Sequence, residues 1–325
     1  MDKSSCDAYI YAKVSSRISK AFSGKNSEKL FAVKSLSELY GLLFNEEVPS
    51  IPESLLAREI EIKSERKFVS EYISLLDCYS HAEDLFLDLL QFYDYENLKV
   101  IAGSLCLKET GFPRILKLGK YALLKYDSWP DISKITAGSC LSWYNKVPEI
   151  FMQQEMDTKL DFQYLSKLWH SVRKMPLNVR NAVMDIFASE ISFNNILWAL
   201  RLKVYYKMTP EEITERLFFE DTGKGENDTL AGDAVKILAW DTSRFDDWKN
   251  WKYKNLINSC VDGMFWEVDP RWVENKVYEV QLKKYFSAFH KFPVSSMSLV
   301  CYFKIKQNEL DNIRRVTEGL RLGGE

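Results

Sequence analysis

The chain carries one short signature three times, and this internal repeat constrains its fold more than any other feature of the sequence. Each copy contains an asparagine that follows a large hydrophobic residue by two positions and precedes an aliphatic residue: Asn97, Asn195 and Asn312. Three positions before each asparagine lies a residue suited to the positive start of a helix: Asp94, Ser192 and Glu309. Each copy therefore predicts the opening of a helix. Because repeated units bury their apolar faces against neighbouring units, the signature also predicts three similar units with a shared core.

The periodicity of hydrophobic residues predicts an all-α protein. Nearly every segment fits the helical period better than the alternation of a strand, and only 13 Gly and 9 Pro interrupt the 325 residues. Around each signature we expect a helix, a turn, a short apolar helix, a hinge and the helix that carries the asparagine. The short apolar helices are expected at 82–92, 179–188 and 295–305. The three units are predicted to form one structural body, with boundaries at 1–110, 111–207 and 208–325.

Capping chemistry predicts several helix boundaries. A first helix ends at Gly24, and a second spans 30–44, within which Ser35 and Glu38 have the spacing of a capping box. The same spacing recurs in Ser50-Ile51-Pro52-Glu53 and is the better start, for a long helix that runs towards Tyr79. Two further starts are predicted at Thr209-Pro210-Glu211-Glu212 and Asp269-Pro270. The polar stretch 221–228, which contains Gly223 and Gly225, is predicted to be a loop and a site of mobility.

Charge and hydropathy disfavour several classes of protein. The 44 Lys and Arg residues nearly balance the 46 Asp and Glu residues, so the net charge of -2 provides no global field that would hold nucleic acid. The longest uncharged stretch, 292–303, has twelve residues, fewer than the roughly 20 that cross a bilayer. The N-terminus lacks the apolar core of a signal peptide, which predicts a cytoplasmic protein. The six cysteines occur singly, so we expect neither a disulfide nor a zinc site.

The sequence predicts no enzyme, cofactor or metal, because no catalytic constellation is present. The three histidines are far apart in the sequence, and Gly223-Lys224-Gly225 lacks the other residues of a P-loop. The segment Asp246-Asp247-Trp248-Lys249-Asn250 is similar to the aspartate-rich magnesium motif of helical terpene synthases, but no second motif follows it. A magnesium-dependent diphosphate enzyme centred on Asp246 and Asp247 is the enzymatic alternative, and a solvated helix start is the favoured interpretation.

A cluster of tryptophans in the third predicted unit gives a second alternative. Lysines 249, 252 and 254 lie between Trp240, Trp248, Trp251, Trp266 and Trp272, an arrangement that could stack bases and contact phosphates. Tryptophan is also a common anchor of cores and protein interfaces, and the neighbouring aspartates would repel phosphate. Packing or a protein interface is therefore favoured over a free-standing helical scaffold that binds peptide or nucleic acid.

The candidate functional positions lie on the signatures and on the last helix. In that helix an apolar stripe faces away from Arg314, Arg315 and Arg321, whose guanidinium groups suit a partner that carries carboxylates. Solvated helix charges would give the same pattern. A side-chain amide at Asn97, Asn195 or Asn312 can tie a hinge to a neighbouring backbone segment, and this structural role is favoured. These six residues are the predicted partner-contact or hinge positions.

Several segments resemble one known family. The C-terminal run from Phe292-Pro293-Val294 through Tyr302-Phe303 to Glu309-Leu310-Asp311-Asn312-Ile313-Arg314-Arg315 is similar to the C-terminal motif of the C-type subunits of archaeal and bacterial V/A-type ATPases, whose eukaryotic counterparts are the d-type subunits. Three further segments are also similar to that family: Tyr9-Ile10-Tyr11-Ala12-Lys13-Val14, residues 30–39, and Phe265-Trp266-Glu267-Val268-Asp269-Pro270.

The resemblance implies a fold and a role. Three similar helical units would form a pseudo-threefold, funnel-like body. This body would sit at the cytoplasmic face of the membrane on the proteolipid ring, bound to the membrane only through its partners, and would receive the tip of the central shaft. The protein would be a non-catalytic adapter that couples ATP hydrolysis or synthesis to ion transport. Torque transfer needs a stiff body, which close-packed helices provide.

Overall fold

The computed structural model describes residues 3–261 and 263–323, and no strand occurs in this part of the chain. The prediction of an all-α protein is confirmed. The α-helices are α1 (Lys3–Lys20), α2 (Glu28–Phe31), α3 (Leu36–Phe44), α4 (Glu53–Leu76), α5 (Asp84–Cys106), α6 (Ile132–Thr136), α7 (Gln153–Arg173), α8 (Leu177–Val204), α9 (Pro210–Thr214), α10 (Gly232–Lys236), α11 (Phe245–Trp248), α12 (Pro270–Lys291) and α13 (Met297–Arg321). Short 3-10 helices lie between them: η1 (Gly24–Ser27), η2 (Gly119–Tyr121), η3 (Tyr126–Ser128), η4 (Ile150–Met152), η5 (Thr222–Asn227), η6 (Ile237–Ala239) and η7 (Lys254–Leu256).

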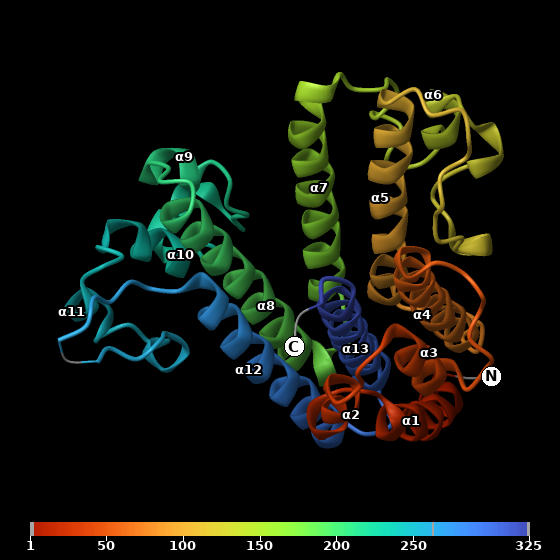
Figure 1. The fold of residues 1–325 in the computed structure, drawn as a ribbon, viewed down its shortest axis with the longest axis horizontal. Coiled ribbons are helices and arrows are strands. Elements are labelled where there is room, and N and C mark those ends of the chain that lie inside the picture. The colour runs from red at the N-terminus through yellow and green to blue at the C-terminus, as the bar shows by residue number, and fades with distance from the viewer. Residues whose placement is uncertain (1–2, 262, 324–325) are drawn as a thin grey trace. The chain divides into compact units, whose positions relative to one another are not determined.

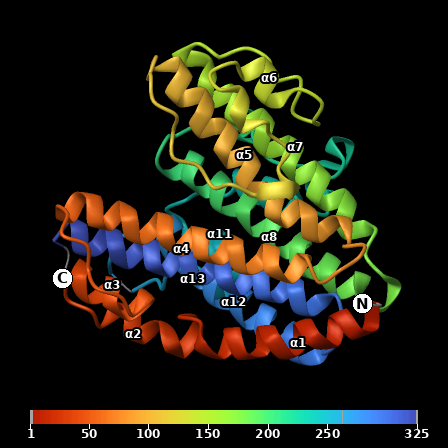
Figure 2. The same cartoon turned by 90° about the vertical axis from the view of Figure 1, so that its right-hand side faces the viewer.

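The chain divides into two compact units. Unit 1 comprises residues 1–179 and 291–325 and therefore joins the two ends of the chain. Within it α13 packs along α4 and α1, as Figure 2 shows, and α5 packs along α7 (Figure 1). The apolar stripe of the last helix is covered here, because Ile313 and Val316 share a core with Leu56 and Ile60 of α4. The last helix is thus packed by the N-terminal segments.

Unit 2 comprises residues 180–290. Its two long helices, α8 and α12, lie side by side (Figure 1) and are joined by polar contacts, including the ion pairs Lys284–Asp185 at 2.8 Å and Arg201–Glu274 at 2.7 Å. The core of the unit packs apolar residues of α8 against the short helices α9, α10 and α11 and against three tryptophans: Trp248, Trp251 and Trp266.

Two predicted helix starts are confirmed, and two other predictions, the extent of one helix and one capping box, need correction. Thr209 forms a full capping box with Glu212, and α12 begins at Pro270. The segment 30–44 is not one helix, because Ser35 is extended and caps α3 by accepting the N–H of Glu38. The prediction of a capping box at Ser50 was wrong: α4 begins after Pro52 without a side-chain cap. A residue that precedes proline is kept out of the helical region, so Ile51 cannot form the first turn.

The prediction that each signature opens a helix was also wrong. Asn97, Asn195 and Asn312 all lie well inside continuous helices, α5, α8 and α13, and the short apolar helices predicted before them belong to the same helices. No hinge separates the two segments. The acidic residues that resembled helix caps are instead buried acceptors. Asp94 and Glu309 accept backbone N–H groups from loops that are distant in the sequence. These side chains therefore fix loops against the helix and do not cap a helix start.

Candidate functional site

Asn97 holds a distant loop by both ends of its side-chain amide. Its Nδ2 donates to the carbonyl of Leu116 at 2.7 Å, and its Oδ1 accepts the N–H of Leu116 at 3.0 Å. The same Nδ2 donates to the hydroxyl of Tyr126 at 2.7 Å. Because Asn97 is buried, these bonds satisfy polar groups that water cannot reach. We call such a contact between a helix asparagine and a loop backbone a latch.

Asn195 forms the same latch in unit 2. Its Nδ2 donates to the carbonyl of Phe218 at 2.8 Å, and its Oδ1 accepts the N–H of Phe218 at 2.9 Å. A further bond runs from Nδ2 to the carbonyl of Leu230 at 2.9 Å. Both latches therefore use a single loop residue that offers its N–H and its C=O to one amide.

The latch at Asn312 is shared between two side chains. Its Nδ2 donates to the carbonyl of Phe22 at 3.2 Å, while the N–H of Phe22 is bound by Oε1 of Glu309 at 2.8 Å. Phe22 lies just after α1, so this latch joins the last helix to the first segment of the chain. The three asparagines thus make related contacts, and each contact fixes a connection next to a long helix.

Different carboxylates support the first two latches. Asp94, one turn before Asn97, accepts the N–H of Leu123 and the hydroxyl of Tyr126, and its burial raises its pKa to about 6. In unit 2 the support comes from Asp228, which is buried in the loop itself. It accepts four backbone N–H groups, those of Glu220, Asp221, Leu230 and Ala231, at 2.8–3.3 Å. The polar stretch predicted as a loop is thus organised around its last residue.

The three predicted arginines lie on the exposed side of α13, where two of them pair with acidic side chains. Arg314 pairs with Glu65 of α4 at 3.0 Å, and Arg321 pairs with Glu318 at 2.5 Å. Arg315 is exposed on the same helix. Burial raises the pKa of Glu65, and the neighbouring Arg314 opposes this shift. We call this surface the charged face.

Sequence reasoning missed the glutamates of the charged face. Glu61 and Glu65 are one turn apart on α4, and burial also raises the pKa of Glu61. Their spacing places them on one side of the helix, and this spacing could have been read from the sequence. What the sequence did not show is that α13 packs beside them.

The structure separates the roles of the clustered tryptophans. Trp248, Trp251 and Trp266 are buried in the core of unit 2, where the ring of Trp248 contacts the other two edge-on. Trp240 joins the same group, while Trp272 is half-exposed on α12. The buried rings contribute to packing and have no free face on which a base could stack.

The two aspartates of the predicted magnesium motif, Asp246 and Asp247, already interact with neighbouring residues. Asp246 pairs with Lys249 at 2.6 Å, and Asp247 accepts the N–H of Asp241 at 3.0 Å. The hydrogen bond from Lys249 lowers the pKa of Asp246. Residues 3–261 and 263–323 contain no group of three or more His, Cys, Asp or Glu side chains placed to hold a metal ion.

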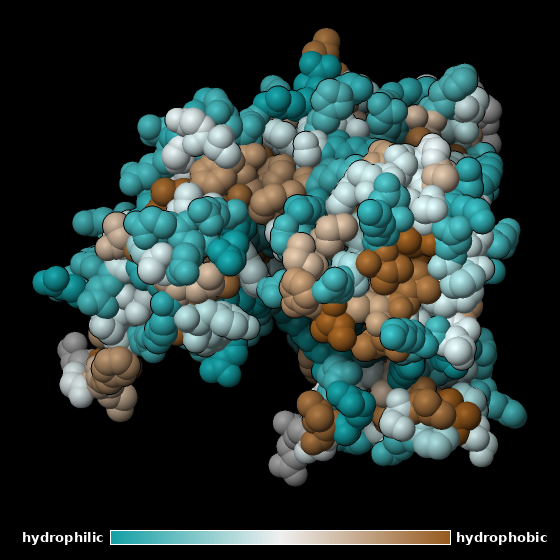
Figure 3. All heavy atoms as spheres, turned by 90° about the horizontal axis from the view of Figure 1, so that it is seen from above, coloured by the Kyte–Doolittle hydropathy of each residue, from teal (hydrophilic) through white to brown (hydrophobic). Residues whose placement is uncertain are grey.

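Some large hydrophobic side chains are exposed, and sequence reasoning did not indicate that exposure. Phe265 and Met264 precede α12 and are 84% and 71% exposed, and Ile150 and Phe151 are similarly exposed before α7. Figure 3 shows hydrophobic side chains gathered in patches between hydrophilic regions on one face of the molecule. In the described part of the chain, no helix has the length and hydropathy needed to cross a bilayer.

Comparison with known proteins identifies the class of protein that this helical architecture represents. The family model of the ATP synthase (C/AC39) subunit matches residues 10–324, which is nearly the whole chain. The chain therefore belongs to the C/AC39 family of V/A-type ATPase subunits, and the resemblance seen in the sequence is confirmed. It is also similar to an uncharacterized protein of Treponema pallidum (strain Nichols), with 27% identity over 330 residues that cover 99% of this chain and 95% of the relative.

Proposed function

We propose that the protein is a non-catalytic adapter in the central stalk of a V/A-type rotary ATPase. In this role it links the central-shaft subunits to the proteolipid ring at the cytoplasmic face of an ion-transporting membrane. The observation that carries the proposal is the family match over residues 10–324. Close packing of the helices within each compact unit supports it, because an element that passes on torque has to resist deformation.

The contacts of α13 suggest how the adapter would recognise the shaft. The charged face presents partly exposed arginines beside partly buried glutamates, so it can orient a partner with complementary charges. Arg314, Arg315 and Arg321 are the proposed contacts on this face. Asn97, Asn195 and Asn312 would contribute indirectly, by fixing the loops beside the long helices.

The ring contact is proposed to use exposed hydrophobic side chains of the third predicted unit. Phe265 and Met264 are the most suitable, because exposed apolar groups of this size become favourable only when a partner covers them. The three latches motivate a related structural proposal. The units at 1–110, 111–207 and 208–325 would be related by a pseudo-threefold axis and form a funnel. Each unit contributes one latch asparagine, and the loop that this asparagine binds belongs to another of the three units.

Co-purification tests the proposed function. The tagged full-length chain is expected to retain the shaft subunits and the proteolipid ring when it is isolated from the membranes of its own organism. The double variant Arg314→Gln/Arg321→Gln is expected to retain at least tenfold less shaft and the same amount of ring. Phe265→Ser is expected to show the opposite pattern. A matched control, Lys29→Gln/Lys34→Gln, removes two exposed charges from another surface and should change neither. A folded preparation that binds neither shaft nor ring would overturn the proposal.

A further inference from the structure

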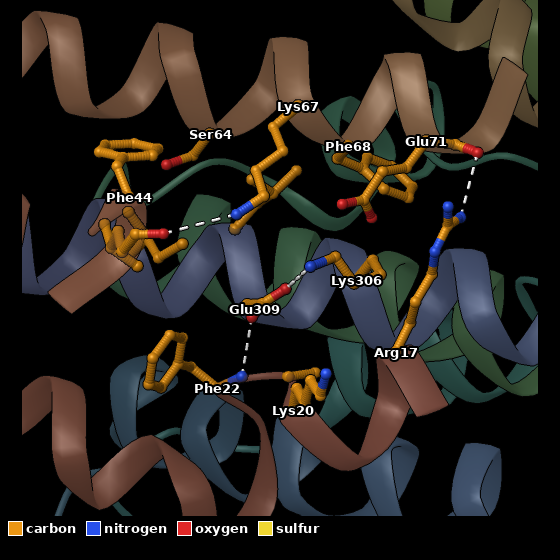
Figure 4. Close-up of a pocket in the computed structure, with 14 residues that line it drawn as sticks. Arg17, Lys20, Phe22, Phe44, Ser64, Lys67, Phe68, Glu71, Lys306 and Glu309 are labelled. Atoms are coloured by element: carbon orange, nitrogen blue, oxygen red, sulfur yellow. Dashed lines mark hydrogen bonds and ion pairs between the residues drawn. The ribbon is translucent and has the colours of Figure 1, made fainter. Parts of the chain in front are cut away.

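A cavity of about 190 Å³ lies within unit 1 where α1, α3, α4 and α13 meet (Figure 4). Its lining contains more positive than negative side chains. The cations are Arg17, Lys20, Lys67 and Lys306, and the carboxylates are Glu71 and Glu309. Glu309 and Phe22, which belong to the latch at Asn312, also line the cavity. The cavity takes no part in the proposed contacts with shaft or ring.

Both carboxylates already have partners inside the protein. Glu309 is buried, accepts the N–H of Phe22 and pairs with Lys306. Glu71 accepts the hydroxyl of Tyr302 at 2.8 Å. The ion pair consumes one of the four cations, and within the described residues no carboxylate pairs with the other three.

The three other cations have weak partners or none. Arg17 donates to the main-chain carbonyl of Glu71 at 3.2 Å, and Lys67 donates to the carbonyl of Leu43 at 3.4 Å. Each cation also lies over an aromatic ring at 6.0 Å from its centroid, Arg17 over Tyr302 and Lys67 over Phe44. Lys20 is exposed and makes no hydrogen bond or ion pair with the described residues. Arg17 and Lys20 come from α1, and Lys67 comes from α4 (Figure 4). A bound anion would replace long contacts to neutral carbonyls with shorter, charge-assisted hydrogen bonds.

The apolar part of the lining strengthens this preference. The rings of Phe22, Phe44 and Phe68 and the side chain of Ile313 form the wall next to the cations. Because apolar surroundings lower the local dielectric, the cations would attract an anion in the cavity more strongly than one on an open surface, and this attraction has to offset the hydration that the anion loses. The fork of Arg17 suits a group with several oxygens, as phosphate has.

We propose that this cavity binds a small phosphate group, either inorganic phosphate or the head of a phosphate monoester. Lys20 and Lys67 would hold it at the rim, and Arg17 would hold it from within. The size of the cavity favours this class of ligand. Sites for drug-sized molecules occupy about 300–1,000 Å³, so the cavity has room for a phosphate head and not for a whole nucleotide.

Titration of the full-length chain with inorganic phosphate and glycerol phosphate, at a fixed ionic strength set with chloride, tests the proposal. Calorimetry is expected to show saturable binding at one site. Lys20→Gln/Lys67→Gln should weaken binding at least tenfold, and Arg17→Lys, which keeps the charge but loses the fork, should weaken it less. The control Lys29→Gln/Lys34→Gln removes the same charge outside the cavity and should bind as the wild type does. The absence of saturable binding up to millimolar phosphate, or an equal loss in the control, would overturn the proposal.

Vesicles distinguish the two sources of the phosphate. If the ligand is a lipid head, vesicles that contain phosphatidic acid should retain the protein, vesicles of phosphatidylcholine should not, and Lys20→Gln/Lys67→Gln should abolish retention. If the ligand is soluble, the calorimetric binding should persist without retention on either vesicle. Because Lys20 and Lys67 are exposed, thermal melting should show that the double variant folds as the wild type does.

Discussion

The latches at Asn97 in unit 1 and Asn195 in unit 2 make the same amide contact but differ in the carboxylate that supports it. Each amide binds the N–H and the C=O of one loop residue. In unit 1 the supporting carboxylate, Asp94, is buried on the helix and has a pKa raised to about 6. In unit 2 it is Asp228, which belongs to the loop and is surrounded by four N–H donors. The repeated element is therefore the amide contact, while the supporting carboxylate comes from the helix in unit 1 and from the loop in unit 2.

The largest expected effect is the loss of the amide itself. Asn97→Ala and Asn195→Ala each remove three hydrogen bonds and leave buried loop groups unsatisfied, so each should lower the free energy of unfolding by about 4 kcal/mol. Denaturant unfolding measures the loss, and hydrogen exchange at Leu116 and Phe218 localises it. Asn194→Ala is the matched control, because Asn194 is exposed beside Asn195, and it should cost less than about 0.5 kcal/mol. If the two latch variants differed by more than about twofold, the latches would not be equivalent.

The next effect depends on pH and separates the two units. Asp94 has a pKa of about 6 in the folded protein and 3.8 as a reference value, so the folded state holds its proton more tightly between these values. The free energy of unfolding therefore rises as the pH falls through 6, and the whole increase due to Asp94 is present below about pH 3.8. The difference amounts to about 3 kcal/mol between pH 7 and pH 3.8. The hydrogen bonds from Tyr126 and Leu123 and, to a smaller extent, nearby Lys167 favour the charged form and limit the rise of this pKa.

Asp94→Asn tests this contribution because asparagine has the same shape and does not titrate. The variant should show a smaller change of unfolding free energy between pH 7 and pH 4 than the wild type, measured by denaturant titration at each pH. Asp228→Asn serves as the comparison from unit 2, because it changes the loop carboxylate and leaves Asp94 in place. Equal slopes for the wild type and Asp94→Asn would show that the latch at Asn97 does not carry the titrating group.

The sequence predicted the class of fold and the positions of the latches, but not what the latches bind. Helical periodicity and the caps at Thr209 and Asp269 depend on residues near one another, so local patterns were sufficient. The asparagines bind loop backbone that lies 19, 23 and 290 residues away. A main-chain N–H or C=O has no side-chain signature, so no motif could mark Leu116, Phe218 or Phe22 as partners.

The same reasoning explains why the signatures were misinterpreted as helix starts. An acid or serine three positions before an asparagine matches the chemistry of a cap, since both arrangements place an acceptor near backbone N–H groups. In the folded protein Asp94 and Glu309 accept N–H groups from loops that tertiary packing brings to them. Local sequence could show that an acceptor was needed, and only the packing of α5 and α13 shows which donor it meets.

The smallest expected effect concerns the third latch, because two side chains share the hydrogen bonds that one asparagine makes in the other latches. Asn312 makes one bond of 3.2 Å to the carbonyl of Phe22 and a longer contact to Asn308, while Glu309 binds the N–H of Phe22. Asn312→Ala should therefore lower the free energy of unfolding by about 1.5 kcal/mol, less than half the loss expected at Asn97. Denaturant unfolding of Asn312→Ala, Glu309→Gln and the double variant measures the coupling, which should be positive because both side chains hold one residue. A loss at Asn312 as large as that at Asn97 would show that the amide alone holds the N-terminal segment against α13.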